Sequence, residues 1–69
     1  MACYIAGDGE ELRALRARRG FSQAELAAEA GVARNTVSNA ECGLPVQLKT
    51  VRKLARALWV EPWELAERD

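Results

Sequence analysis

The segment GVARNTVSNAECG, residues 31 to 43, gathers side chains suited to directed hydrogen bonding. It carries only small apolar residues near its middle, and around them lie Arg34, Asn35, Thr36, Ser38 and Asn39. Arginine donates from a planar fork, whereas asparagine both donates and accepts. The chemistry on offer is therefore recognition of a polar partner, although a polar helix face is more often simply solvated. The segment alone does not decide between these interpretations.

Catalysis and metal binding are disfavoured by the residues that would have to perform them. The sequence has no histidine, and Cys3 and Cys42 form neither a zinc-binding spacing nor a paired-cysteine redox motif. It also lacks a glycine-rich loop for phosphates and has little room for a substrate cleft. We therefore expect a protein that is not an enzyme, with no catalytic residues, cofactor, metal site or small-molecule substrate.

The charges are unevenly distributed although the formal net charge is zero. Residues 13–56 hold nine basic residues and three acidic ones, an excess of six positive charges. The balancing acids lie toward the two ends of the chain. Local potential follows the placement of charge more than its total, so a polyanionic partner is compatible with the neutral sum. Solvated arginines on helix faces would give the same count.

The 69 residues predict one small domain, 1–69, of the all-α class. The apolar residues are mostly alanine and leucine, with one phenylalanine and one tyrosine, which favours helices over sheets. No stretch is long enough to cross a membrane, and the N-terminus does not resemble a signal peptide. A domain of this size is marginally stable alone, which makes association with a second copy plausible.

Capping signals divide the sequence into five helices. The first is expected near Asp8, its N-cap, and ends at Gly20; the second follows the capping box of Ser22 and Glu25 and ends at Gly31. The third covers about 34–41, with Val37 and Ala40 on its inner face. The fourth covers about 48–58, and a short fifth helix starts at 62. We expect a compact five-helix bundle.

The second and third helices, joined by a three-residue turn, form a helix-turn-helix at about 22–42. FSQAELAAEAGVARNTVSNAECG resembles this motif in the Cro and phage-repressor family, the XRE-type regulators of bacteria and phages. The matching features are the apolar residue before Ser22, Gln23, Leu26, Ala27, the turn 30–32, Val37, Ala40, and Glu41 before Gly43. LKTVRKLARALWVEPWEL is similar to the last two helices of the family. The resemblance covers residues 8–66 and implies a lambda-repressor-like DNA-binding fold.

The resemblance implies a regulator that binds double-stranded DNA. The third helix would enter the major groove, where arginine can pair bidentately with guanine and asparagine with adenine. The expected base-reading residues are Arg34, Asn35, Ser38 and Asn39. The expected contacts to the DNA backbone come from Ser22, Gln23, Arg16, Thr36 and Lys49, with Gln23 also a candidate partner of Arg34. Cys42 departs from the family, which often has a phosphate-binding asparagine there.

The resemblance also implies a structural ion pair and a homodimer. Arg16 and Glu41 match an arginine and a glutamate that often lock the third helix to the first. Trp59 and Trp63 either complete the core or form a dimer surface, and two-fold association would place the reading helices on a palindromic operator, about 34 Å apart. We expect a repressor or autoregulator of the Cro, phage-repressor or restriction-modification controller kind.

One alternative stays open: an antitoxin, or another interaction module, that binds a toxin or other partner protein as well as, or instead of, DNA. Antitoxins of this fold also bind their own promoters, so the two hypotheses overlap. In either case we expect reduced cysteines and a location in the bacterial cytoplasm or nucleoid, or in the host cytoplasm for a phage protein.

Overall fold

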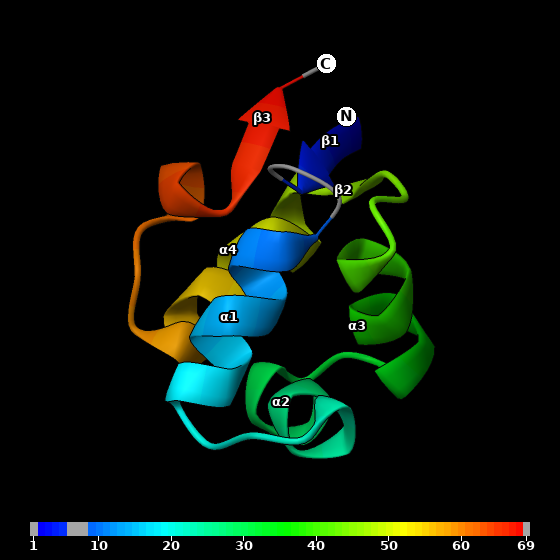
Figure 1. The fold of residues 1–69 in the computed structure, drawn as a ribbon. Coiled ribbons are helices and arrows are strands. Elements are labelled where there is room, and N and C mark those ends of the chain that lie inside the picture. The colour runs from blue at the N-terminus through cyan, green and yellow to red at the C-terminus, as the bar shows by residue number, and fades with distance from the viewer. Residues whose placement is uncertain (1, 6–8, 69) are drawn as a thin grey trace.

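Four α-helices and a small sheet make up the fold (Figure 1). The computed structural model describes residues 2–5 and 9–68, and the statements below refer to these. The helices are α1 (Glu10–Arg18), α2 (Gln23–Ala30), α3 (Arg34–Glu41) and α4 (Leu48–Leu58). The strands are β1 (Ala2–Ile5), β2 (Val46–Gln47) and β3 (Ala66–Arg68), and a 3-10 turn, η1, covers Pro62–Glu64. The helix-turn-helix expected from the sequence is α2 and α3.

The N-cap of α1 differs from the expectation. The capping residue is Gly9, at φ 86°, whereas Asp8 lies outside the described residues. A β-carbon on Gly9 would overlap the backbone carbonyl of Glu41, at the end of α3. Glycine is therefore required here both for its left-handed conformation and for the close approach of the two helix ends. Glu10 and Glu11 lie in the first turn, where their negative charges interact favourably with the helix dipole.

The α2 and α3 boundaries confirm the capping signals. The Ser22 hydroxyl accepts the backbone N–H of Glu25 at 3.0 Å, and the Glu25 carboxylate accepts the backbone N–H of Ser22 at 2.8 Å. Gly31 ends α2 in the left-handed conformation at φ 73°. Ala33 then caps α3 in an extended conformation. The turn is thus set by local chemistry before the two helices pack against each other.

The C-terminal part of the chain departs from the five-helix expectation. Helix α4 has the expected bounds, but the fifth helix is absent and its place is taken by η1. Pro62 starts the turn as expected, and Leu65 is fully buried directly after it. The chain then enters β3, which pairs with β1, so the backbone N–H and C=O groups bond across strands instead of extending the turn.

The sheet was not foreseen by the all-α expectation. It is antiparallel, with strand order β2-β1-β3. Cys3 faces Val46 on one side and Arg68 on the other, while Ile5 faces Ala66. The strands have two to four residues each, too short to show an alternating pattern of apolar and polar residues. The sheet ties both ends of the described chain to the start of α4.

One cluster of buried apolar side chains forms the core. Leu12, Leu26, Leu54 and Leu65 are its largest fully buried members, and Val37 and Val51 complete its centre. Every α-helix contributes to it. Among the residues described, no helix is both long and apolar enough to cross a membrane.

Candidate nucleic-acid interface

Helix α3 presents a polar face to solvent. Arg34, Asn35 and Asn39 are exposed, and Thr36 and Ser38 are half-buried. The opposite face is formed by Val37 and Ala40, both fully buried. The four residues expected to read bases therefore lie on the accessible part of one helix. Hydrogen-bonding groups on this face are available to a macromolecular partner.

Small residues allow α3 to pack closely against the neighbouring helices. Val37 and Ala40 are short, and Gly9 has no side chain, so α3 packs closely against the N-terminal end of α1. Helix α2 covers the other flank of α3. As a result, α3 is held from two sides, and its polar residues stay accessible to solvent at the edge of the fold where Figure 1 shows the helix.

The last residue of α3 carries a buried carboxylate. The Glu41 side chain is only 2% exposed. Its Oε2 accepts the Arg16 Nε–H at 2.5 Å, and its Oε1 accepts an Arg16 Nη2–H at 3.2 Å. The Arg16 Nη1 group also donates to the backbone carbonyl of Phe21 at 2.9 Å. One guanidinium therefore joins α1, the end of α3 and the residue before the α2 cap, which is the ion pair expected from the sequence.

Two further residues complete the surroundings of Glu41. The Gln23 Nε2 group donates to Oε1 at 3.1 Å, and the Arg13 Nε lies 3.7 Å from the same oxygen. Arg34 was a candidate partner of Gln23, but the hydrogen bond of Gln23 in the structure is to Glu41. An amide nitrogen carries two hydrogens, so the bond to Glu41 leaves the second one for another acceptor. Arg13 was not anticipated, although its position three residues before Arg16 puts both on the same helix face.

The charge of Glu41 is stabilised despite its burial. Burial by itself raises the pKa of this carboxyl group. The hydrogen bonds from Arg16 and Gln23 and the positive charges of Arg16 and Arg13 outweigh that effect, and the pKa lies below its usual 4.5. The carboxylate is therefore ionised at neutral pH and acts as a fixed acceptor at the base of α3.

Two more of the residues expected to contact the DNA backbone are exposed at the starts of α2 and α4. Ser22 is exposed at the N-terminus of α2, although its hydroxyl is already used as a cap. Lys49 is exposed in the first turn of α4. Cys42, a free thiol, is exposed at the C-cap of α3. These exposed positions lie at the N-cap of α2, in the first turn of α4 and at the C-cap of α3.

Two tryptophans lie away from α3. Trp59 is 79% exposed and Trp63 is 75% exposed, so neither completes the core. Trp59 ends α4 in the left-handed conformation, at φ 60°, and the Arg19 guanidinium stacks 3.9 Å from the centre of its ring. In Figure 1, η1, which contains Trp63, lies on one side of the molecule and α3 on the other.

Comparison with known proteins places these features in a wider group. Residues 12–62 match a family model described as helix-turn-helix. Over 55 residues the chain is 40% identical to a protein of Methanocella arvoryzae assigned as an HTH-type transcriptional regulatory protein. The match covers 80% of this chain and 17% of that protein, so the chain corresponds to about a sixth of its length.

Two solved structures share both sequence and fold. The restriction-modification controller protein C.AhdI from Aeromonas hydrophila is 44% identical, with a TM-score of 0.77 over 81% of this chain and 86% of that one. A hypothetical transcription factor, NHTF, from Neisseria is 33% identical, with the same TM-score over 87% of this chain and 70% of that one. At these levels of identity, the shared fold and the shared helix-turn-helix sequence support each other.

Proposed function

Since this chain belongs to the helix-turn-helix family of XRE-type transcriptional regulators, we propose that it binds double-stranded DNA sequence-specifically through α3 and regulates transcription from the bound site. The observation that carries this proposal is the exposed polar face of α3 on a helix anchored by Arg16 and Glu41. A base-reading helix needs both properties, because its side chains must be accessible and its register must be fixed.

We assign base reading to Arg34, Asn35, Ser38 and Asn39. The major groove displays a different pattern of donors and acceptors for each base pair, and these side chains match it. Arginine suits the two acceptors of guanine, and asparagine suits the paired donor and acceptor of adenine. The proposal is supported by their accessibility along one helix.

We assign contacts with the phosphates to Ser22, Gln23, Thr36 and Lys49, with a smaller share for Arg16. Gln23 can hold Glu41 with one amide hydrogen and a phosphate oxygen with the other. Arg16 is 17% exposed and uses three of its five N–H groups inside the protein, so its main task is to position α3. These contacts add affinity without sequence information, and they make binding strongly dependent on salt.

We further propose that the protein acts as a homodimer on a palindromic operator and represses transcription, including that of its own gene. The exposed Trp59, at the end of α4, and Trp63, in η1, mark the region of the dimer surface on the side opposite α3 in Figure 1, because aromatic residues are enriched at such interfaces. Joining two copies on that side separates their α3 helices, as two half-sites about 34 Å apart require. The similarity to a restriction-modification controller protein supports a role in regulating transcription.

None of the three similar proteins is described as an antitoxin, and we do not propose that activity. The DNA proposal is tested by measuring binding to genomic fragments and to a random duplex over a range of salt concentrations. Arg34→Ala and Asn39→Ala should each reduce the preference for the selected fragment by about 1–3 kcal/mol, whereas Lys49→Ala should weaken binding to every duplex alike. Equal losses on all duplexes for the α3 variants would show that these side chains do not read bases.

A further inference from the structure

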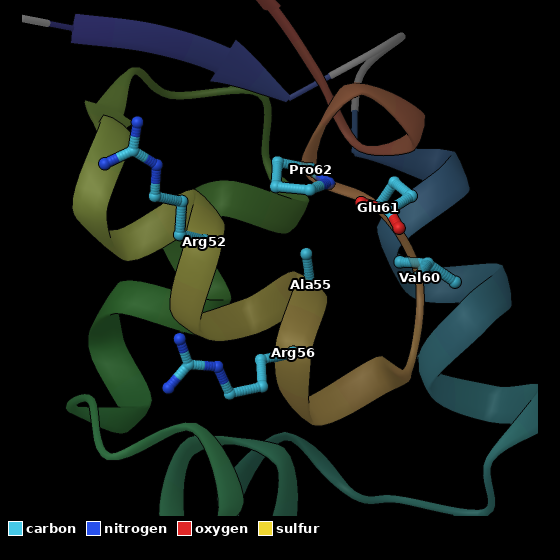
Figure 2. Close-up of a pocket in the computed structure, with 6 residues that line it drawn as sticks. All are labelled: Arg52, Ala55, Arg56, Val60, Glu61 and Pro62. Carbon is cyan, nitrogen blue, oxygen red and sulfur yellow. The ribbon is translucent and has the colours of Figure 1, made fainter.

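A pocket of about 360 Å³ lies beside the outer face of α4. It is lined by Arg52, Ala55 and Arg56 of α4 and by Val60, Glu61 and Pro62 of the segment that follows. Figure 2 shows the two arginines on one side, the 60–62 segment on the other, and Ala55 between them. Ala55 is 1% exposed and forms an apolar floor. The pocket therefore combines an apolar base with two arginines on one side and Glu61 on the other.

The two arginines have no anionic partner within the described chain. The ion pairs found there join Arg13 and Arg16 to Glu41, and none involves Arg52 or Arg56. A guanidinium on the wall of an apolar pocket is suited to stacking on an aromatic ring or to pairing with a carboxylate. The chemistry of the pocket thus predicts a ligand that is aromatic at its centre and acidic at its edges.

The sequence EPWE, residues 61–64, has that chemistry. Trp63 projects into solvent, 75% exposed, and the exposed Glu61 and Glu64 lie on either side of it. Two hydrogen bonds hold the turn: the Glu64 carboxylate accepts the backbone N–H of Glu61 at 2.8 Å, and the Glu61 backbone carbonyl accepts the backbone N–H of Glu64 at 2.9 Å. A pre-organised turn loses little entropy when it binds.

The position of this turn beside the pocket makes a reciprocal contact feasible. Glu61 and Pro62 line the pocket, and Trp63 directly follows them without lining it. A protein surface that carries a projection next to a complementary cavity can pair with itself about a two-fold axis, which makes each contact twice. We propose that Trp63 of each copy inserts into the pocket of a second copy, between Arg52 and Arg56, with Glu61 and Glu64 facing those arginines. This inference rests on the dimeric state in the proposed function and assigns its interface.

Trp59 has a different role in this arrangement. Its ring is already covered on one face by Arg19, and its backbone ends α4. It therefore holds the ends of α1 and α4 together within one copy. Trp63, which has no cation–π partner among the described residues, is the residue that crosses to the partner.

The first test follows the environment of Trp63 itself. In a Trp59→Phe variant, Trp63 is the only tryptophan, so its fluorescence reports on the proposed contact. Its emission should shift to shorter wavelength as the protein concentration rises, at the concentration where sedimentation shows the mass doubling. A doubled mass with an unchanged spectrum would place the dimer interface elsewhere and overturn the inference. Monomers at all concentrations would also overturn it.

The second test reverses charge inside and outside the pocket. Arg56→Glu brings a carboxylate toward Glu61 and Glu64 of the partner, and it should raise the dimer dissociation constant at least tenfold. Lys53→Glu is the matched control, because Lys53 is exposed on the same helix but does not line the pocket; it should change the constant less than threefold. Equal effects of the two variants would overturn the inference.

DNA binding is measured on the same variants, so that a wrong dimer interface can be distinguished from a wrong assignment of DNA binding. Arg56→Glu should still bind a single half-site with the preference of the unmodified protein, while cooperative binding to two half-sites is lost. A protein that dimerises through Trp63 but shows no sequence preference would contradict the proposed function and leave the interface standing. A Trp63→Ala variant that retains full cooperativity would contradict the interface alone.

Discussion

The guanidinium of Arg16 holds the carboxylate of Glu41 with two hydrogen bonds, across 25 positions of the sequence. The pair joins the last turn of α1 to the last residue of α3. Because the third donor of Arg16 holds the Phe21 carbonyl, the same side chain also fixes the approach to α2. The orientation of α3 relative to the rest of the helix-turn-helix therefore depends on one buried polar contact as well as on apolar packing.

Replacing Arg16 should destabilise the fold strongly. In Arg16→Ala the Glu41 carboxylate stays buried with only Gln23 and the more distant Arg13 to compensate, and the loss should be on the order of 3 kcal/mol. Arg16→Lys should recover only part of it, since an ammonium cannot reproduce the bidentate geometry. Urea unfolding measures the loss of stability in each of the two variants. A loss below about 1 kcal/mol for Arg16→Ala would mean that the pair contributes no more than an exposed one.

The pKa of Glu41 predicts a loss of stability in acid. Because its pKa is lower in the folded chain than the usual 4.5, the unfolded chain binds a proton more readily. The stabilisation is therefore complete above the unfolded value and is lost as pH falls through 4.5 to the folded pKa. Unfolding free energies measured from pH 7 downward should show a steeper decline for the natural chain than for Glu41→Gln. Parallel curves would show that Glu41 does not titrate between these values.

Gly9 is predicted to tolerate no side chain. A β-carbon there would both adopt a left-handed conformation and overlap the Glu41 carbonyl, so Gly9→Ala has to displace α1 from α3. Gly20 is a matched control with φ 76° and open space around it. Gly20→Ala should cost about 1–2 kcal/mol for the conformation alone, and Gly9→Ala should cost clearly more. Thermal unfolding of the two variants makes the comparison; similar costs would mean that the close approach is easily relieved.

The sequence was sufficient for the parts of the fold that local chemistry determines. The capping box at Ser22 and the bounds of α3 and α4 follow from side chains within a few residues. The sheet depends instead on pairing between residues such as Cys3 and Val46, far apart in the chain and without a local pattern. Pro62 signals the start of η1, but the pairing of β3 with β1 ends it after Glu64, so the expected fifth helix is only a 3-10 turn followed by a strand.

The sequence predicted the polar face of α3 and the ion pair that anchors this helix, but not the other contacts around them. The polar face of α3 and the pair of Arg16 with Glu41 followed from spacing and family resemblance. The close approach at Gly9 and the bond from Gln23 to Glu41 did not, because both depend on how α1, α2 and α3 meet in space. Glycine near a helix start is usually explained by the turn alone, so the sequence held no separate signal for the contact with Glu41.

Trp59 provides a test of two opposing local effects. A bulky residue at φ 60° is strained, so Trp59→Gly should gain about 1 kcal/mol in backbone energy. The same change removes the stacking with Arg19, which is worth about 0.5–1 kcal/mol at an exposed site. The single variant should thus be nearly neutral, whereas in an Arg19→Ala background Trp59→Gly should be stabilising. Chemical unfolding of the natural protein, the two single variants and the double variant separates the backbone contribution from the stacking contribution. If Trp59→Gly changes the stability equally in both backgrounds, stacking contributes nothing.

Cys42 offers a gain of DNA affinity, because it is exposed at the end of α3 and a thiol is a weak donor. An asparagine there would supply an amide N–H to a phosphate. A neutral hydrogen bond is worth about 1 kcal/mol, so Cys42→Asn should strengthen binding about fivefold. The gain should be equal on selected and random duplexes, since phosphates carry no sequence information. Cys42→Ala, which cannot donate, should leave the affinity unchanged. A gain restricted to one sequence would instead show that position 42 reaches a base edge.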